Sequence, residues 1–268
     1  MPRKAPPPGY YTATQAIQHL NISEGMLYKY VRAGKLHSYK PSTRKQGFYL
    51  ASEVDALAEA ERAFFEATND ETDTDGVFTM ATPEDMESVS ELAKRLLSSQ
   101  ITADRRREWM TREPRGHYVV RRKDGTVVAY FYLQPLKHDK LVAYMRKEIR
   151  GWDITAEDIE PFAPGKPVEV MLGGIGSLDE DPGYVSVLLR GIREDLKRLG
   201  QEGVTMSHLY AYSDRPKGIA MCVHLGMYQW EPPIGKRATF VLDVEKSNTF
   251  ILQPYKKALA EWKHNHTS

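Results

Sequence analysis

The sequence has little cysteine and no long apolar run, and each shortage excludes a class of structure. Cys222 is the only cysteine among 268 residues, so the chain can form neither an intramolecular disulfide nor a cysteine-based zinc site. No apolar stretch approaches the roughly 20 residues that a membrane-spanning helix needs. The first nine residues lack the apolar core of a signal peptide. We therefore expect a cytoplasmic protein with no membrane partner.

The net charge of +1 hides an uneven distribution along the chain. Residues 1–50 contain eight Lys or Arg and a single acid, Glu24, whereas residues 51–76 contain one Arg and nine acids. The rest of the chain is nearly balanced. A basic first segment beside an acidic one predicts a polyanionic partner for the first segment alone.

Residues 12–34 have the spacing of two short helices joined by a tight turn. Thr12 and Gln15 form a capping box at the start of the first helix. Asn21 can take the left-handed conformation between the helices, and Gly34 can end the second one. This pattern predicts a helix-turn-helix.

Residues 35–50 are typical of two short strands around a polar loop, and a third helix, capped by Ser52, follows them. With these elements the segment resembles the excisionase/MerR-like winged helix-turn-helix family. The resemblance implies a DNA-binding domain over residues 1–66. The matching elements are Tyr11-Thr12, Ile22-Ser23, Tyr28-Lys29, Gly34-Lys35-Leu36 and Leu50-Ala51-Ser52-Glu53-Val54.

The basic side chains of this segment independently favour double-stranded DNA as a partner. The start of the second helix would reach base edges, while the lysines and arginines of the wing would neutralise phosphates. The alternative is a solvated basic face on a protein-binding module. The candidate DNA-binding residues are Ser23, Glu24, Tyr28, Lys29, Arg32, Lys35, Lys40, Arg44 and Lys45.

Residues 67–76 are rich in acids, and their composition predicts a flexible acidic linker. From residue 77 onward, strands and helices alternate in the order strand, two helices, three strands, helix, strand, helix, strand. That order, with residues 137–167 as an insertion, resembles the GNAT acetyltransferase superfamily over residues 77–246. Residues 220–227 resemble the alanine-x-tyrosine-x-x-leucine-glycine-phenylalanine box of that family.

The expected fold is therefore an α/β (α+β) chain of two domains. A small winged helix-turn-helix is followed by a GNAT-like domain with a mixed, mostly antiparallel sheet flanked by helices. Residues 247–268 are expected to form a C-terminal tail.

The resemblance also locates the loop with which GNAT enzymes bind the pyrophosphate of coenzyme A. The family motif there is Gln/Arg-x-x-Gly-x-Gly/Ala, but in this sequence Glu180 takes the first position and Val185 the last; Gly183 and Ser186 match the family pattern. A carboxylate about 4 Å from a phosphate costs about 4 kcal/mol at an effective dielectric constant of about 20. We expect a degenerate loop and no bound cofactor, with acetyl-CoA disfavoured.

Only two residues are candidates for a catalytic role, and each is a candidate by its position alone. Cys222 stands where the family has a proton-donating tyrosine, and Glu169 lies on the strand that usually supplies a general base. The glycines of residues 172–177 fit either an anion-binding nest or two diverging strands. No combination of residues predicts a metal site.

The functional interpretation is a DNA-binding transcriptional regulator whose GNAT-like domain senses, dimerises or scaffolds without catalysis. The alternative is a DNA-targeted N-acetyltransferase that uses acetyl-CoA, and a third hypothesis is an accessory factor in DNA excision. Besides DNA, a small-molecule effector and a second copy of the chain stay open as partners. The helix at residues 54–65 would pair with its copy or pack on its own wing.

Overall fold

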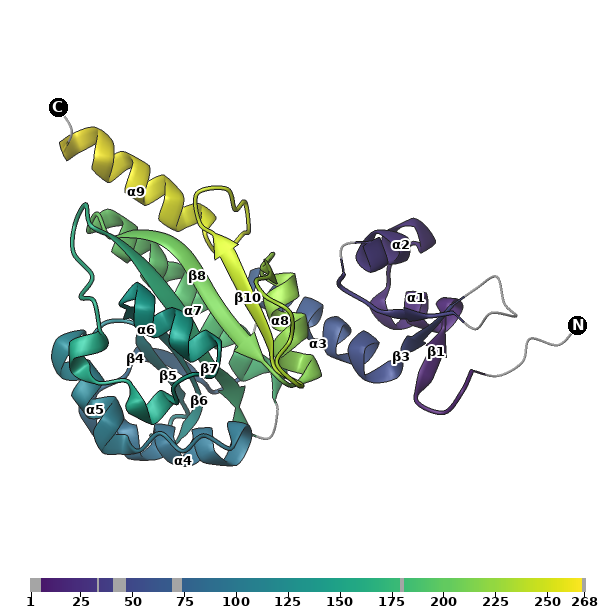
Figure 1. The fold of residues 1–268 in the computed structure, drawn as a ribbon, viewed down its shortest axis with the longest axis horizontal. Coiled ribbons are helices and arrows are strands. Elements are labelled where there is room, and N and C mark those ends of the chain that lie inside the picture. The colour runs from purple at the N-terminus through teal and green to yellow at the C-terminus, as the bar shows by residue number, and fades with distance from the viewer. Residues whose placement is uncertain (1–5, 33, 41–46, 69–73, 179–180, 267–268) are drawn as a thin grey trace, which may run out of the picture.

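The computed structural model describes residues 6–32, 34–40, 47–68, 74–178 and 181–266. Its N-terminal unit contains short helices and a three-stranded antiparallel sheet in the order β1-β3-β2 (Figure 1). The elements of this unit are β1 (Tyr10–Thr12), α1 (Ala13–Leu20), α2 (Glu24–Arg32), β2 (Ser38–Tyr39), β3 (Phe48–Leu50) and α3 (Ala51–Thr68).

The turn signals of this unit are confirmed. Gln15 donates its backbone N–H to the Thr12 hydroxyl at 3.3 Å, and its side-chain oxygen accepts from the Thr12 N–H at 2.9 Å. Asn21 and Gly34 have positive φ angles of 50° and 70°. The expected cap at Ser52 is wrong, because α3 begins one residue earlier, directly after β3. The assignment of the unit to a winged helix-turn-helix stays a prediction.

The rest of the chain forms a seven-stranded sheet in the order β4-β5-β6-β7-β8-β10-β9. All neighbouring strands are antiparallel except β7 and β8, so the expectation of a mixed, mostly antiparallel sheet is confirmed. The strands are β4 (Val77–Met80), β5 (His117–Arg121), β6 (Val127–Leu136), β7 (Pro167–Ser177), β8 (Thr205–Ser213), β9 (Tyr228–Gln229) and β10 (Ala238–Asp243).

Helices cover both faces of this sheet. On one face, α7, α8 and α9 pack over a core that includes Leu188, Leu209 and Val223. On the other face, α4 and α5 pack against β5 and β6, and α6 packs beside them. The helices are α4 (Met86–Leu97), α5 (Ala103–Arg112), α6 (His138–Met145), α7 (Pro182–Gln201), α8 (Pro216–His224) and α9 (Gln253–His266), with short 3-10 turns at Pro83–Asp85, Gly151–Asp153 and Ala156–Asp158.

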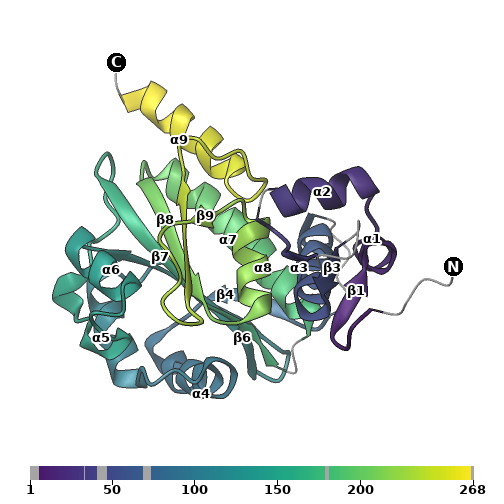
Figure 2. The ribbon, with the colours of Figure 1, turned by 45° about the vertical axis from the view of Figure 1, so that its right-hand side comes forward.

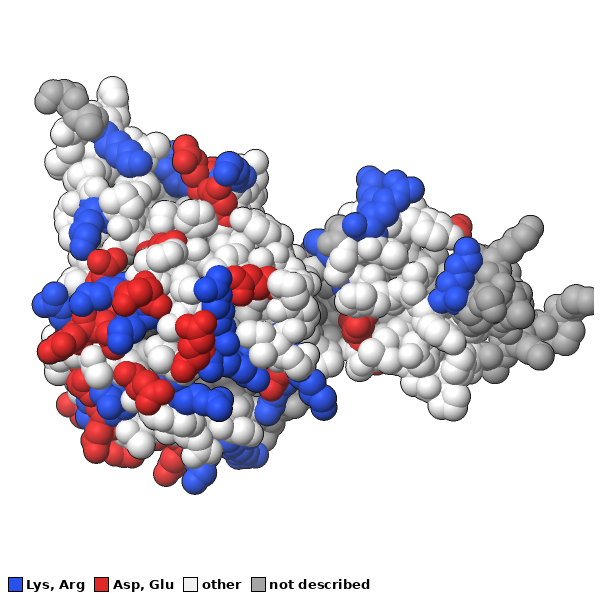
Figure 3. Space-filling view, in the orientation of Figure 1, with Lys and Arg blue, Asp and Glu red and all other residues white. Residues whose placement is uncertain are grey.

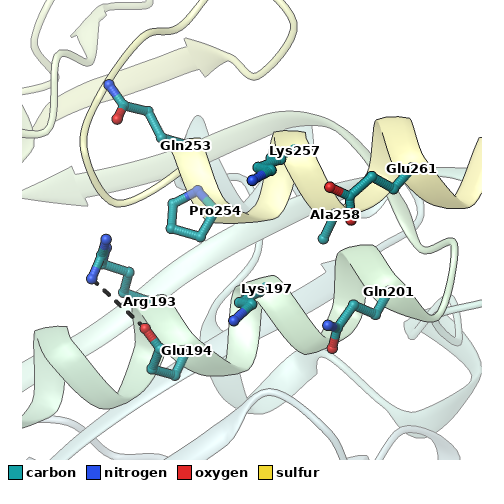
Figure 4. Close-up of a pocket in the computed structure, with 9 residues that line it drawn as sticks. All are labelled: Arg193, Glu194, Lys197, Gln201, Gln253, Pro254, Lys257, Ala258 and Glu261. Carbon is teal, nitrogen blue, oxygen red and sulfur yellow. Dashed lines mark ion pairs between the residues drawn. The ribbon is translucent and has the colours of Figure 1, made fainter.

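Residues 247–268, which the sequence predicted as a tail, contain the helix α9. It packs along α7, and the Tyr255 hydroxyl anchors it by donating to the Val204 carbonyl at 2.9 Å and accepting from the Met206 N–H at 2.8 Å. Between the two helices runs a groove of about 390 Å³ (Figure 4). The groove is lined by Arg193, Glu194, Lys197, Gln201, Gln253, Pro254, Lys257, Ala258 and Glu261.

The helix α3 connects the two sheets and packs against both α7 and α8 (Figure 2). Ala220 of α8 joins the apolar core of the N-terminal unit, and Lys217 forms an ion pair with Glu59 of α3 at 3.0 Å. Neither the boundaries at residues 66 and 76 nor dimer formation through this helix is tested by these contacts. No helix of the described residues is long and apolar enough to cross a membrane.

Candidate active site

The sheet has an opening between strands β7 and β8. The two strands pair in parallel up to Met171, which lies opposite Tyr210. Beyond that point β7 continues to Ser177 paired with β6, while β8 continues to Ser213 paired with β10. Within the described part of the chain, the end of β7 therefore has one edge without a strand partner. Its unpaired backbone groups face the space between the strands.

Glycines in β7 let two tyrosine rings of β6 lie directly against the strand. A Cβ at Gly173 would lie 2.1 Å from the Tyr132 ring, and one at Gly174 would lie 2.2 Å from the Tyr130 ring. The register between β6 and β7 also shifts at this point. Of the two explanations left open for residues 172–177, strand divergence with close ring contacts accounts for the glycines.

A cleft of about 450 Å³ occupies this opening. Small-molecule sites in proteins usually measure about 300–1,000 Å³, so the cleft is large enough for a substrate. Its lining comes from β6, β7, β8, α8 and the segments around residues 96–101 and 149–152, with three residues of α3 at one side and single residues of α5, α6, α7 and the turn before β10. The lining side chains considered below are Glu59, Arg106, Tyr130, Tyr132, Tyr144, Val185, Tyr212, Lys217, Cys222 and Arg237.

Two arginines of the lining are almost completely buried. Arg106 is 1% exposed and donates its Nε to the Ser90 hydroxyl at 3.2 Å. Arg237 is 7% exposed. One of its terminal N–H groups donates a hydrogen bond to the Tyr144 carbonyl at 3.1 Å, while its Nε has no hydrogen-bond partner. Among the described residues, neither guanidinium forms an ion pair with a carboxylate.

Four tyrosines surround these cations. The hydroxyls of Tyr144 and Tyr212 share a hydrogen bond of 2.8 Å, and their rings meet edge to face. Burial raises the pKa of Tyr132 to about 12, and burial also raises the pKa values of Tyr130 and Tyr144. Tyr130, Tyr132 and Tyr144 therefore stay protonated at neutral pH and can donate hydrogen bonds inside the cleft.

The two catalytic candidates, Cys222 and Glu169, lie in different parts of the domain. Cys222 lines the cleft from α8, but it is packed in the apolar core, and burial raises the pKa of its thiol to about 12. Glu169 is not among the residues that line the cleft. Its carboxylate lies 2.6 Å from the His138 ring nitrogen and accepts from the Tyr210 hydroxyl at 3.1 Å. The structure does not bring the two residues together.

At the start of α7, a carboxylate of the preceding loop binds the backbone of the helix. Gly183 donates its backbone N–H to the side chain of Asp181 at 2.8 Å, so that N–H is already occupied by a carboxylate of the chain itself. Val185 lines the cleft and Ser186 is fully buried within α7. Glu180 lies outside the described residues.

Most of the candidate DNA-binding residues lie on the surface of the N-terminal unit. Ser23 caps α2 by accepting from the Met26 N–H at 3.2 Å, and Glu24 accepts from the Tyr28 hydroxyl. Lys29 and Arg32 are exposed on α2 and Lys40 is exposed after β2, while the Lys35 ammonium lies 5.1 Å from the Tyr30 ring centroid. Basic side chains gather near α2 (Figure 3). Arg44 and Lys45 lie outside the described residues.

Sequence inspection missed both buried arginines. A signal existed for Arg106, because it lies three and four positions before Trp109 and Met110 and therefore shares their buried face of α5. No local signal marks Arg237, which follows an exposed turn. No group of three or more His, Cys, Asp or Glu among the described residues is arranged to hold a metal ion.

No protein-family model and no curated protein matches the chain. Several solved structures are similar in fold. Ard1 from Thermoplasma volcanium is 14% identical with a TM-score of 0.43, and the match covers 63% of this chain and 98% of Ard1. YhbS from Escherichia coli, a GNAT family N-acetyltransferase in complex with CoA, is 14% identical with a TM-score of 0.41 over 70% and 88% of the two chains. NAA60 from Arabidopsis thaliana, in complex with a bisubstrate analogue, is 11% identical with a TM-score of 0.41 over 63% and 97%.

The interpretation as a DNA-binding transcriptional regulator with a non-catalytic domain is corrected by these findings. The similar structures include an N-acetyltransferase with CoA and a histone acetyltransferase from Corynebacterium glutamicum. The order of strands and helices on which the GNAT-like assignment depends is also present. At these identities the likeness extends to the fold alone. DNA as a partner, the nine DNA-binding candidates and the disfavoured binding of acetyl-CoA stay predictions.

Proposed function

We propose that the chain is an acyl-CoA-dependent N-acetyltransferase. The observation that carries the proposal is the divergence of β7 and β8 after Met171, which leaves the backbone of β7 free along the cleft. An extended ligand with amide groups can bind such an edge as an added strand, through main-chain hydrogen bonds. The pantetheine arm of acetyl-CoA has this chemistry. Delivery to DNA by the N-terminal unit stays a prediction, which salt-dependent binding of duplex DNA to the full chain would test.

The two parts of acetyl-CoA fit the described residues unequally. The β7 edge suits the amide-bearing arm, whereas the start of α7 does not offer a free cradle to the diphosphate. There the Asp181 carboxylate occupies the N–H of Gly183, at 2.8 Å. Binding therefore depends mainly on the arm and is expected to be weak.

Removal of the carboxylate that occupies the first turn of α7 should strengthen acetyl-CoA binding. Asp181→Ala frees the Gly183 N–H and removes one negative charge beside the diphosphate position, so affinity should rise about tenfold. Calorimetry on the native chain and the variant measures the change. Asp139→Asn, an exposed acid in the first turn of α6, serves as the control and should leave affinity unchanged. If the native chain neither binds acetyl-CoA at millimolar concentration nor acetylates any amine, the proposed function is wrong.

When bound, acetyl-CoA would supply an acetyl thioester: the amine nitrogen bonds the acetyl carbon, the carbon–sulfur bond breaks, and the proton that the amine loses balances the one that the leaving sulfur gains. The protein must provide that proton and hold the amine. Cys222 is poorly suited, because its thiol is packed in the apolar core and only 7% exposed. Tyr212 is better placed, since it is 37% exposed, lines the cleft and is linked to Tyr144. We assign the proton donor to this tyrosine pair.

Single substitutions separate the two donors. Tyr212→Phe keeps the ring beside Arg237 and removes the hydroxyl, so kcat should fall about 100-fold with little change in KM. Cys222→Ala should keep kcat within about twofold, because the thiol only packs. Thiol release from acetyl-CoA, followed under steady-state conditions, gives both constants. The reverse pattern would return the role to Cys222.

A further inference from the structure

Two buried cations in the cleft have no internal counter-charge in the described part of the chain. Arg106 and Arg237 are 1% and 7% exposed, and neither forms an ion pair there. Burying an unpaired charge is costly, and proteins normally satisfy it with a carboxylate or a ligand. The Nε of Arg237 also lacks any hydrogen-bond partner. A buried, unpartnered donor in the wall of a cleft indicates that a ligand supplies the missing acceptor.

The two guanidinium groups face the same space. The guanidinium carbon of Arg106 lies 5.8 Å from the ring centroids of both Tyr130 and Tyr132. That of Arg237 lies 3.5 Å from the Tyr212 ring centroid and 5.3 Å from that of Tyr144. Both arginines counteract the burial-induced rise in the pKa of Tyr132, which places this phenol within the electrostatic reach of each.

The charge of the lining also favours an anion. Five Lys or Arg residues line the cleft against two carboxylates, Glu59 and Asp214. Of these two, Glu59 is already paired with Lys217. The excess of positive charge therefore remains after internal pairing, and it surrounds a space whose walls are aromatic.

The position of Arg237 separates it from the start of α7. Its guanidinium lies against Tyr212, two residues beyond the Tyr210–Met171 pair and so level with Gly173, whereas α7 begins only after β7 has ended at Ser177. Four residues of a strand span about 13 Å. Arg106 lies nearer to that helix, beside Tyr130 and Tyr132, which pair with Gly176 and Gly173. Arg237 therefore does not lie where a diphosphate would meet a helix N-terminus.

We propose that the acceptor amine carries a carboxylate, as an amino acid does, and that Arg106 and Arg237 bind this carboxylate between the tyrosine rings. A planar guanidinium matches a carboxylate through paired N–H donors, and the rings accommodate an apolar side chain. The inference rests on the proposed function, because it names the substrate class of the same site. Removal of either arginine should then weaken acceptor binding more than it changes the chemical step.

Matched acceptors provide the test on the full-length chain. Free L-phenylalanine, L-leucine, L-methionine and L-glutamate are compared with their amides, which keep the amine and lose the α-carboxylate. With acetyl-CoA as donor, at least one acid should be acetylated with a kcat/KM about 30-fold above its amide. Arg237→Gln and Arg106→Gln should each lower kcat/KM for that acid about 30-fold, mainly through KM, and abolish the preference over the amide.

One exposed cation close in sequence to each arginine serves as a control. Lys236→Gln and Arg112→Gln should keep kcat/KM within about twofold, because both side chains lie on the surface. Thermal unfolding supplies a second readout, since removing an unpaired buried charge should not lower the melting temperature. A large drop in melting temperature in both glutamine variants would assign the arginines a structural role and overturn the inference.

The remaining outcomes distinguish the inference from the proposed function. Acetylation of the amides as fast as the acids would overturn the inference while the acetyltransferase stands. The native chain could also prefer succinyl-CoA to acetyl-CoA, and the arginine variants could lose that preference. This result would assign the bound carboxylate to the acyl donor and would overturn the inference too. If no amine is acetylated, calorimetry with the N-acetyl derivatives of the four acids decides. Binding that requires both arginines supports the anion site without the enzyme, and no binding rejects it.

Discussion

Replacement of Gly174 by alanine is expected to lower the free energy of unfolding by about 3 kcal/mol and to distort the cleft. Gly174 has a φ of +75°, a conformation that costs any residue with a Cβ about 1 kcal/mol or more. The new Cβ would also lie 2.2 Å from the ring of Tyr130, which is 2% exposed and cannot move aside freely. Overpacking of this kind adds about 1–3 kcal/mol. Denaturant unfolding measures the sum.

Gly125→Ala separates the two contributions. Gly125 also has a positive φ, 88°, but a Cβ there would have no atom within 4 Å. Its substitution should therefore cost only the backbone contribution, about 1 kcal/mol. Equal losses at the two positions would mean that the Tyr130 ring moves without cost. The glycines of β7 would then not be needed to seat the tyrosines beside Arg106.

Features with local chemical causes could be predicted from the sequence. The capping box of Thr12 and the left-handed turns at Asn21 and Gly34 depend on residues within a few positions of one another. The order of strands and helices follows from apolar periodicity in the same way. The helix α9 was missed although its buried residues Tyr255, Ala258 and Leu259 have helical spacing, because most of its other residues are polar.

The candidate site could be predicted only in part, because it depends on distant residues that meet in space. Arg106 comes from α5 and Arg237 precedes β10, and no local pattern brings them together. The functional interpretation depended instead on one loop, in which Glu180 and Val185 replace the expected residues. That loop concerns the diphosphate alone. The opening between β7 and β8 depends on strand pairing, which the sequence expresses only as a group of glycines.

Acidification from pH 7 to pH 5 is expected to destabilise the native chain by about 2 kcal/mol through His117 alone. His117 is 4% exposed on β5, and burial, with a smaller effect of the Arg106 charge, lowers its pKa to about 3. In the unfolded chain the imidazole titrates near 6.5. At pH values between these two pKa values, the imidazole is protonated in the unfolded state and neutral in the native state. The free energy of unfolding therefore has its full value above pH 6.5. It falls by about 1.4 kcal/mol per pH unit as the pH falls toward 3.

His117→Phe should remove this dependence while preserving the ring stacked on Tyr132. Its free energy of unfolding, measured in denaturant at pH 7 and pH 5, should change by about 2 kcal/mol less than that of the native chain. His224, whose pKa burial lowers to about 4, is present in both proteins and cancels in the comparison. Val119→Ala, a fully buried change on the same strand, should lower stability equally at both pH values. An unchanged pH dependence in His117→Phe would mean that the native protein admits a proton at His117, and hence that water reaches the wall behind Tyr132 and Arg106.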